Sequence, residues 1–316
     1  MKKSYQILNI KKNEGKMFYL FINVLIIVLF FYIQKKKNNK ITKVCICTIG
    51  KKENLYIREF VTYYEKFGVD KIYLYDNNDE DNEHFEDVIA DYIDKGFVKI
   101  LNWRNIESPQ FKAIEDCYLN YNKYYNWLIF FDIDEYIHLY NFNNIKDYLN
   151  QQKFNRCKKI CLNWVLHTDN EKIYYENLSL FKRFPDVEKD AYISKKFSQR
   201  VKSIVRGNIS NFIIANNTQQ AHIITESVKG CNGFGKKINF DEEFYLKNSD
   251  SKYYYIDHFY SKSLEEFINK IKRGFASNGK NEITKLFKII KYFSINKLRN
   301  NKFLYIIKEL GINLKI

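Results

Sequence analysis

An alternation of strand-like and helix-like segments over residues 41–132 restricts most strongly what this chain can fold into. The strand-like segments are 41–48, 71–76, 97–101 and 127–132, and the helix-like segments between them are 54–67, 84–95 and 110–124. Strands that alternate with helices of this length predict a parallel sheet with helices on its faces. We therefore expect an α/β, Rossmann-like fold with a mostly parallel sheet.

The pattern changes after about residue 155. Strand-like segments joined by longer connections are expected at 159–165, 198–205, 209–214 and 253–260. A helical segment is predicted to begin near Ser263. Within it, residues 284–304 carry an apolar face, which favours packing on the domain over lying on a membrane surface.

The apolar, uncharged run at 17–33 predicts a single-pass membrane anchor. It corresponds to about 26 Å of helix, which is the lower limit for spanning a bilayer. Lysines flank both ends, which disfavours a buried core helix, and no small-residue cleavage site follows, which disfavours a cleaved signal peptide. Both flanks are basic, so the positive-inside rule does not choose an orientation.

Five parts of the chain are expected from these patterns. They are a basic tail at 1–16, the anchor at 17–33, a linker at 34–42, the α/β domain at 43–262 and a helical segment at 263–316. The chain is predicted to be a single-pass membrane protein. In a eukaryote we expect a type II protein of the Golgi or secretory membranes, and otherwise a membrane-associated protein that faces the cytosol.

Charge and cysteine content exclude some classes of protein. The formal net charge is +15, but the lysines are spread along the chain without an Arg-rich arm or zinc-finger spacing, so nucleic-acid binding is disfavoured. Proximity to a membrane and a phosphate-bearing substrate account for this charge better. The six cysteines form no Cys-x-x-Cys pair and predict neither a zinc site nor a disulfide scaffold. Cys45 and Cys47 are expected in the core, on one face of a strand.

The strongest chemical feature is Asp132-Ile133-Asp134-Glu135, which directly follows the apolar strand WLIFFD. Like charges buried at a strand end are costly unless a cation neutralises them. A hard divalent ion with oxygen ligands, Mn²⁺ or Mg²⁺, would do so and could bridge two phosphates. We therefore expect a metal site at Asp132 and Asp134. An acidic loop without the strand would predict only a solvated turn.

Two weaker features accompany it. Asp76-Asn77 follows the strand KIYLYD, where a carboxylate and an amide could contact a ribose or a pyrimidine, although an Asn/Asp-rich turn explains the same residues. His258, in YIDHFYS, could be a late metal ligand or contact a diphosphate. A hydrogen-bonded core histidine is the plainer interpretation.

In their order and spacing these motifs resemble glycosyltransferase family 92 and related GT-A enzymes, from Lys43 to about Gly274. The segments that carry the resemblance are ENLYIREFVTYYEKFGVDKIYLYDNN, WLIFFDIDEYI, LNWVLH, KSIVR and DHFYSKSLEEFINKIKRG. The chain departs from the family pattern at Tyr136 and Phe259. A glycine-bearing turn usual after the Trp of LNWVLH is replaced by His167-Thr168-Asp169, which puts the acceptor in doubt.

The resemblance implies an anchored GT-A enzyme that transfers a sugar, often from UDP-galactose, to a glycan, glycoprotein or glycolipid with inversion. The residues that it assigns to the donor are Asp76, Asn77, Asp132 and Lys202, and those that it assigns to the metal are Asp132, Asp134 and His258. An inverting transfer also needs a base for the acceptor hydroxyl. Its candidates, which the sequence does not rank, are Glu135, Asp169 and Glu226.

Two other functions compete with this one. A nucleotidyltransferase would need a Gly-rich basic loop after the first strand, whereas this chain has Gly50-Lys51-Lys52-Glu53 there. A catalytically degenerate, membrane-tethered carbohydrate-binding or scaffold protein is the remaining alternative. The intact Asp132, Asp134 and His258 oppose it.

Overall fold

The computed structural model describes residues 22–29, 42–80, 83–107, 109–189, 200–209, 230–238 and 252–274. The chain divides into two compact units, Met1–Thr42 and Lys43–Ile316. In the first unit, residues 22–29 form a helix whose apolar side chains are exposed. No helix within the described ranges is long and apolar enough to cross a membrane. The rest of the predicted anchor at 17–33 lies outside these ranges, as do the tail at 1–16 and most of the linker.

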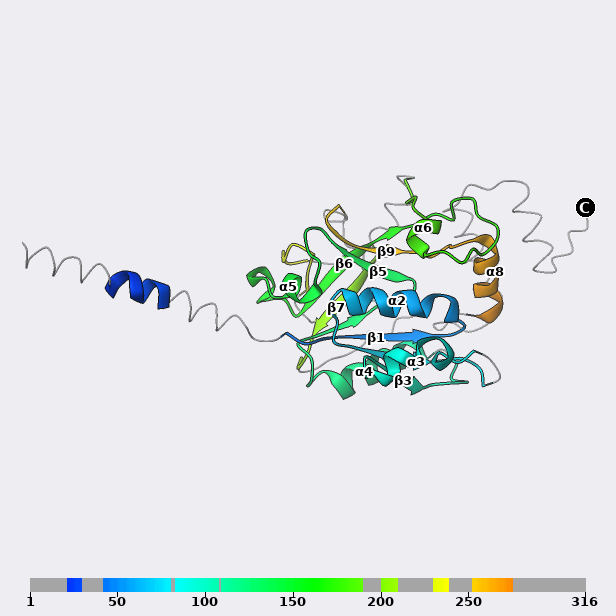
Figure 1. Ribbon diagram of the computed structural model, residues 1–316, viewed down its shortest axis with the longest axis horizontal. Helices are drawn as coiled ribbons and strands as arrows, with labels where there is room; N and C mark the ends of the chain where they lie inside the picture. Colours follow the sequence, from blue (N-terminus) through cyan, green and yellow to red (C-terminus); the bar gives the residue numbers. More distant parts are fainter. Residues whose placement is uncertain are drawn as a thin grey trace, which may run out of the picture. The chain divides into compact units, whose positions relative to one another are not determined.

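The second unit is built on a nine-stranded sheet with the order β3-β2-β1-β4-β7-β6-β9-β5, in which β8 pairs with β6 (Figure 1). The strands are β1 (Val44–Gly50), β2 (Lys71–Asp76), β3 (Val98–Asn102), β4 (Trp127–Phe130), β5 (Glu135–Leu139), β6 (Lys159–Leu166), β7 (Val201–Arg206), β8 (Gly230–Cys231) and β9 (Tyr254–His258). The α/β class is confirmed, and the half formed by β3, β2, β1 and β4 is parallel throughout. Antiparallel pairs β4–β7, β6–β7 and β5–β9 make the other half mixed.

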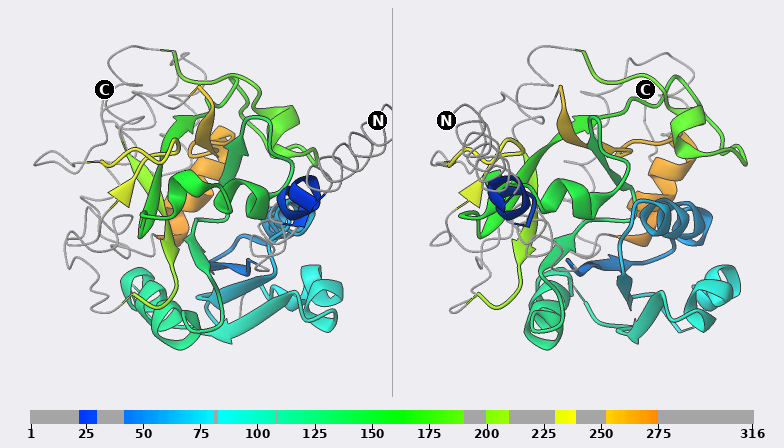
Figure 2. Two further views of the ribbon diagram at one scale, coloured as in Figure 1. Left: turned by 90° about the vertical axis from the view of Figure 1, so that its left-hand side faces the viewer. Right: turned by 60° about the vertical axis from the view of Figure 1, so that its left-hand side comes forward.

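Helices cover both faces of the parallel half. They are α2 (Asn54–Lys66), α3 (Glu86–Asp94) and α4 (Gln110–Tyr121), and the remaining helices are α5 (Ile145–Leu149), the 3₁₀ turn η1 (Gln152–Phe154), α6 (Leu180–Arg183) and α8 (Leu264–Arg273). Side chains alternate along β1, so Val44 and Ile46 pack in the core cluster that includes side chains of α2 and α3, whereas Cys45 and Cys47 pack in the cluster that includes side chains of α4. Figure 2 shows α4 on the opposite face of these strands from α2 and α3. The prediction that Cys45 and Cys47 share a buried face is confirmed.

The buried face of helix α2 follows the spacing of its apolar residues in the sequence. Ile57, Phe60, Val61 and Tyr64 are buried in the larger core cluster, as their spacing predicts. Leu55, in the first turn of the same helix, is 58% exposed, so the buried face does not include every apolar side chain of α2.

The C-terminal part of the domain differs more from expectation. The strand predicted at WLIFFD, residues 127–132, ends at Phe130, and a second strand that was not predicted, β5, begins at Glu135. Helix α8 begins after Ser263, which caps it in a capping box with Glu266, and its apolar side chains are buried in the same core as those of α2. The predicted strand at 209–214 and the amphipathic segment at 284–304 lie almost wholly outside the described residues.

The domain contains two disulfides, so the prediction that the cysteines form no disulfide scaffold is wrong. Cys47 on β1 is bonded to Cys117 on α4, and Cys157 is bonded to Cys231 on β8. Their partners are 70 and 74 residues apart, so only the folded geometry could pair them. The first disulfide ties a strand of the parallel half to the helix that covers it.

We predict that Cys117→Ser lowers the free energy of unfolding by about 2–4 kcal/mol, because the disulfide closes a long loop in the unfolded chain. Urea denaturation of the oxidised protein measures this change. Cys45→Ala, at a free buried cysteine of the same strand, is the control and should cost about 1 kcal/mol. A Cys117→Ser protein as stable as the wild type would contradict the prediction.

Candidate functional site

The carboxylates of the Asp132–Glu135 segment lie at the carboxyl end of β4, in the turn that connects it to β5. The Glu135 amide donates to the Asp132 carbonyl, and the Asp132 amide donates to Glu135 Oε2, each over 3.0 Å. Strand β5 pairs with β9 so that Glu135 lies opposite His258. The Phe259 amide donates to the Asp134 carbonyl over 3.0 Å. Sheet pairing therefore brings His258 to Asp134 and Glu135, although it lies 124 and 123 residues farther along the chain.

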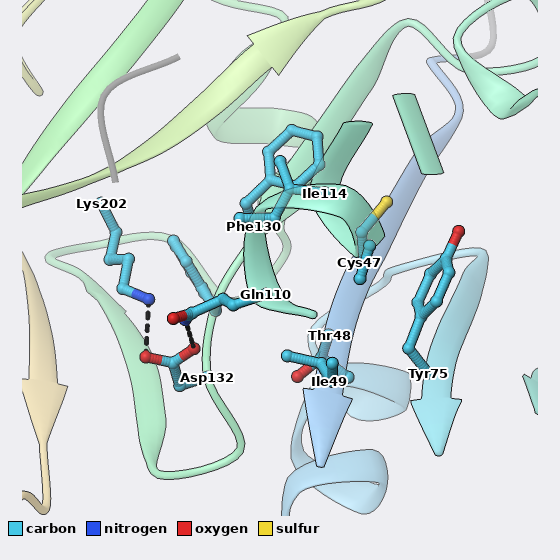
Figure 3. A pocket seen from close by; sticks show the side chains of 11 residues that line it. Cys47, Thr48, Ile49, Tyr75, Gln110, Ile114, Phe130, Asp132 and Lys202 are labelled. Atoms are coloured by element: carbon cyan, nitrogen blue, oxygen red, sulfur yellow. Dashed lines mark hydrogen bonds and ion pairs between the residues drawn. The ribbon is translucent and has the colours of Figure 1, made fainter. Parts of the chain in front are cut away.

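Lys202 on β7 neutralises one side of this turn. Its Nζ lies 2.8 Å from Asp132 Oδ2 and 3.1 Å from Glu135 Oε2, and its side chain is buried. Figure 3 shows Lys202 and Gln110 both pointing toward Asp132, and Gln110 Nε2 donates to Asp132 Oδ1 over 3.3 Å. Burial lowers the pKa of Lys202, but Asp132 and Glu135 outweigh it and leave the pKa raised, so the ammonium stays charged.

Asp134 has a separate set of cations. Its Oδ2 lies 2.8 Å from Lys270 Nζ and 3.4 Å from Lys262 Nζ, and its Oδ1 lies 3.6 Å from His258 Nε2. Burial raises the pKa of Asp134, but Lys270, Lys262 and His258 outweigh burial and hold it well below 3.8. Asp134 is therefore a charged carboxylate in a buried, cationic setting.

The pKa of Glu135 is shifted in the opposite direction to that of Asp134. Glu135 is fully buried, and burial, together with the neighbouring Asp132 and Asp134, raises its pKa well above 4.5 although Lys202 opposes the shift. Among the base candidates, Asp169 is also buried and accepts a hydrogen bond from the Glu171 amide. Glu226 lies outside the described residues. The structure thus leaves the three base candidates unranked.

Asp76 and Asn77 lie at the end of β2, but both are engaged in holding the loops around them. Asp76 Oδ2 lies 2.6 Å from Arg104 Nη2, and its Oδ1 accepts from the amide and side chain of Asn78. The Asn77 side chain donates to the carbonyls of Trp103 and Ile106. These contacts give both residues a clear structural role beside the predicted contact with a donor.

A divalent ion fits this site only in part. Within the described residues no group of three or more His, Cys, Asp and Glu side chains is arranged to hold a metal ion. Asp134 and His258 are the pair that could share one, because Asp134 Oδ1 lies 3.6 Å from His258 Nε2 and the two lysines approach only Asp134 Oδ2. In Asp132, Lys202 and Gln110 engage both carboxylate oxygens. Magnesium often binds through one or two protein ligands plus substrate phosphates, so a two-ligand site remains chemically reasonable.

A narrow pocket opens beside Asp132, between β1 and α4 (Figure 3). Its walls include Thr48, Ile49, Tyr75, Gln110, Asp132 and Lys202. Its volume is about 10 Å³, which is room for a single water. The pocket can therefore hold one small polar group beside Asp132 but is too small for a whole nucleotide.

The sequence analysis missed the cations that serve Asp134 and its neighbour Glu53. These are Lys262, Lys270 and Arg273, the last of which bonds to Glu53. The sequence carries only a partial signal of them. Glu266, Lys270 and Arg273 are four and three residues apart, which places them on one face of α8 but does not connect them to Asp134.

We predict that Asp134→Asn lowers the free energy of unfolding at pH 7 by about 3 kcal/mol, because it leaves buried ammonium groups without their carboxylate. The pKa of Asp134 is lowered in the folded protein, so its stabilising charge is present above pH 3.8 and is lost as the pH falls through the lowered pKa. The deficit of the variant should therefore shrink in acid. Urea denaturation at a series of pH values measures it.

Glu135→Gln is the matched control for that experiment. Since burial raises the pKa of Glu135, its carboxylate contributes less stabilising charge, and the amide should lower the free energy of unfolding at pH 7 by clearly less than Asp134→Asn does. Equal losses of unfolding free energy in Asp134→Asn and Glu135→Gln would contradict the lowered pKa of Asp134 and the raised pKa of Glu135.

Comparison with known proteins finds a matching family and related sequences. The sequence profile described as glycosyltransferase family 92 matches residues 41–286. Glycosyltransferase family 92 proteins of Ricinus communis and Oryza sativa subsp. japonica are 30% and 27% identical over 117 residues, which is 37% and 36% of this chain. Those stretches are 21% and 19% of the two plant proteins, so the match spans about a fifth of their length.

Solved structures give a weaker likeness. Staphylococcus aureus TarS, residues 1–349 in complex with UDP-GlcNAc, is 17% identical with a TM-score of 0.37, over 85% of this chain and 80% of that one. At that level the likeness carries no argument about the site.

Proposed function

The chain belongs to glycosyltransferase family 92, and on that premise we propose that it transfers a sugar from a nucleotide-sugar donor to a glycan or glycoconjugate acceptor. The observation that carries the proposal is the cluster around Asp132 and Asp134 at the carboxyl end of β4, since ligands of parallel α/β sheets bind beyond that edge. A UDP-hexose, with UDP-galactose as the first candidate, is the proposed donor.

The proposed reaction is one displacement at the anomeric carbon of the sugar. The bond from that carbon to the phosphate oxygen breaks, and its electron pair leaves with the nucleoside diphosphate. The acceptor hydroxyl oxygen bonds to the opposite face of the carbon, and its proton passes to a base, which gives inversion. Cationic groups fixed near the departing diphosphate stabilise the charge that develops there.

Individual residues take roles that follow from their surroundings. The Asp132 side chain is 34% exposed at the mouth of the narrow pocket, so it can accept from donor hydroxyl groups. Asp134 and His258 would hold a Mn²⁺ or Mg²⁺ ion, which when bound would act as a Lewis acid on the diphosphate. Lys202 pairs with Asp132 and orients its carboxylate. Glu135, Asp169 and Glu226 stay the base candidates.

We also propose that the enzyme is anchored by residues 17–33 and works in an oxidising compartment. The disulfides Cys47–Cys117 and Cys157–Cys231 support this, since such bonds persist in secretory compartments and are rare in the cytosol. A type II protein with a lumenal domain satisfies both features.

We predict that the full chain releases UDP from a UDP-sugar in the presence of Mn²⁺ and an acceptor, and that His258→Asn lowers kcat/KM by about 100-fold or more, because an electrostatic group at the reacting centre is lost. A coupled UDP-release assay over several UDP- and GDP-sugars measures this. The control is Glu65→Gln, an exposed position of α2, which should retain full activity.

The alternative of a carbohydrate-binding or scaffold protein makes a different prediction. A folded wild-type chain that binds glycans but turns over no donor would favour it and refute the proposed transferase. Full activity of His258→Asn would leave the transferase standing and refute the site.

A further inference from the structure

A second pocket, larger than the one beside Asp132, lies between the N-terminal end of α2 and α8. Its walls come from the loop after β1, the first turn of α2, and the segment from Ser261 to Arg273. Its volume is about 400 Å³, within the range of sites that hold small ligands. It therefore has the space for a phosphate-bearing group that the narrow pocket lacks.

The charge of the lining favours an anion. The cationic side chains are Lys52, Lys262, Lys270, Lys272 and Arg273, and the anionic ones are Glu53, Glu83 and Glu266. Five positive and three negative groups leave an excess of two positive charges. Behind the lining, Arg183 lies 2.7 Å from Glu266 and Asp134 lies 2.8 Å from Lys270, so these two outer charges cancel and the excess of two positive charges stands.

Lys262 is held in this pocket at a conformational cost. Its φ of +52° lies in the left-handed region, which a non-glycine residue occupies only where its surroundings force it. Its Nζ lies over the Tyr56 ring, 4.1 Å from the ring centre, and 3.9 Å from Glu53 Oε2. Lys52, on the facing wall, has a φ of +53°. Two lysines in this rare conformation thus line one pocket.

Lys270 reaches the same place from α8. Lys262 and Lys270 both approach a single oxygen, Asp134 Oδ2. The three cations Lys262, Lys270 and Arg273 share two carboxylates, Asp134 and Glu53, so one positive charge is left for a further anion. The Lys270 side chain is 16% exposed, which leaves it within reach of a ligand in the cavity.

We propose that Lys262 and Lys270 bind the phosphate groups of the donor directly and stabilise the diphosphate as it departs. This assignment rests on the proposed transferase function. Lys262 and Lys270, in the segment 259–273 that follows β9 and includes α8 (the β9–α8 segment), are then substrate-binding residues. Asp134 then positions both lysines in addition to its proposed part in holding the ion.

Binding of inorganic pyrophosphate to the full chain in EDTA tests the assignment, because calorimetry reports it without metal or turnover. The wild type should bind, and Lys270→Gln should weaken binding by about 10-fold or more. Lys270→Arg should keep most of the affinity, because it retains the charge. Lys66→Gln, at an exposed lysine of α2, should leave binding unchanged. Thermal melting of each variant shows that it is folded.

The outcomes separate this assignment from the proposed function. Unchanged pyrophosphate affinity in a folded Lys270→Gln protein overturns the assignment, even if the wild type is an active transferase. Lys270-dependent pyrophosphate binding without turnover of any donor supports the anion site and refutes the transferase. UDP should compete with pyrophosphate. If both bind at once, the pocket takes another phosphate-bearing group and the assignment to the donor fails.

Discussion

Burial of two adjacent carboxylates, Asp134 and Glu135, is the constraint on which the rest of this structure depends. Both side chains lie at the end of β4 with almost no exposure to water, where an uncompensated charge would cost several kcal/mol. Lys202 compensates one side of the turn and Lys270 the other, and these lysines come from β7 and α8. The C-terminal half of the domain must therefore fold back onto the end of β4 for that turn to exist.

The sheet topology meets this requirement. Strand β7 pairs antiparallel with β4 and carries Lys202, while the pairing of β5 with β9 sets His258 opposite Glu135. The capping box at Ser263 then starts α8 directly after β9. The same arrangement gathers more positive than negative charge around a cavity. A fold that only needed to neutralise its carboxylates would not require that excess, whereas an enzyme that releases a nucleoside diphosphate would use it.

Periodicity predicted the parallel half well, because β1, β2 and α2 each follow a local apolar pattern. For the same reason the sequence correctly placed Asp132 and Asp134 just after the carboxyl end of β4. Strand β5 was missed because it is short, begins with a glutamate and is defined by pairing with β9. The partners of Asp134 were also beyond reach, since nothing local separates Lys262 and Lys270 from the 52 Lys and Arg residues of the chain. Asp76 likewise shows no sign in the sequence of its tie to Arg104.

The central claim is that the carboxylates after β4 and the lysines of the β9–α8 segment form one donor site. Hydrogen exchange of the full chain with and without UDP, followed by mass spectrometry, tests this most directly. The account predicts that UDP slows exchange together in two segments, 131–136 and 258–264, and leaves the C-terminal end of α2 unchanged. Protection confined to other parts of the chain, in a protein that still turns over a UDP-sugar, would contradict it.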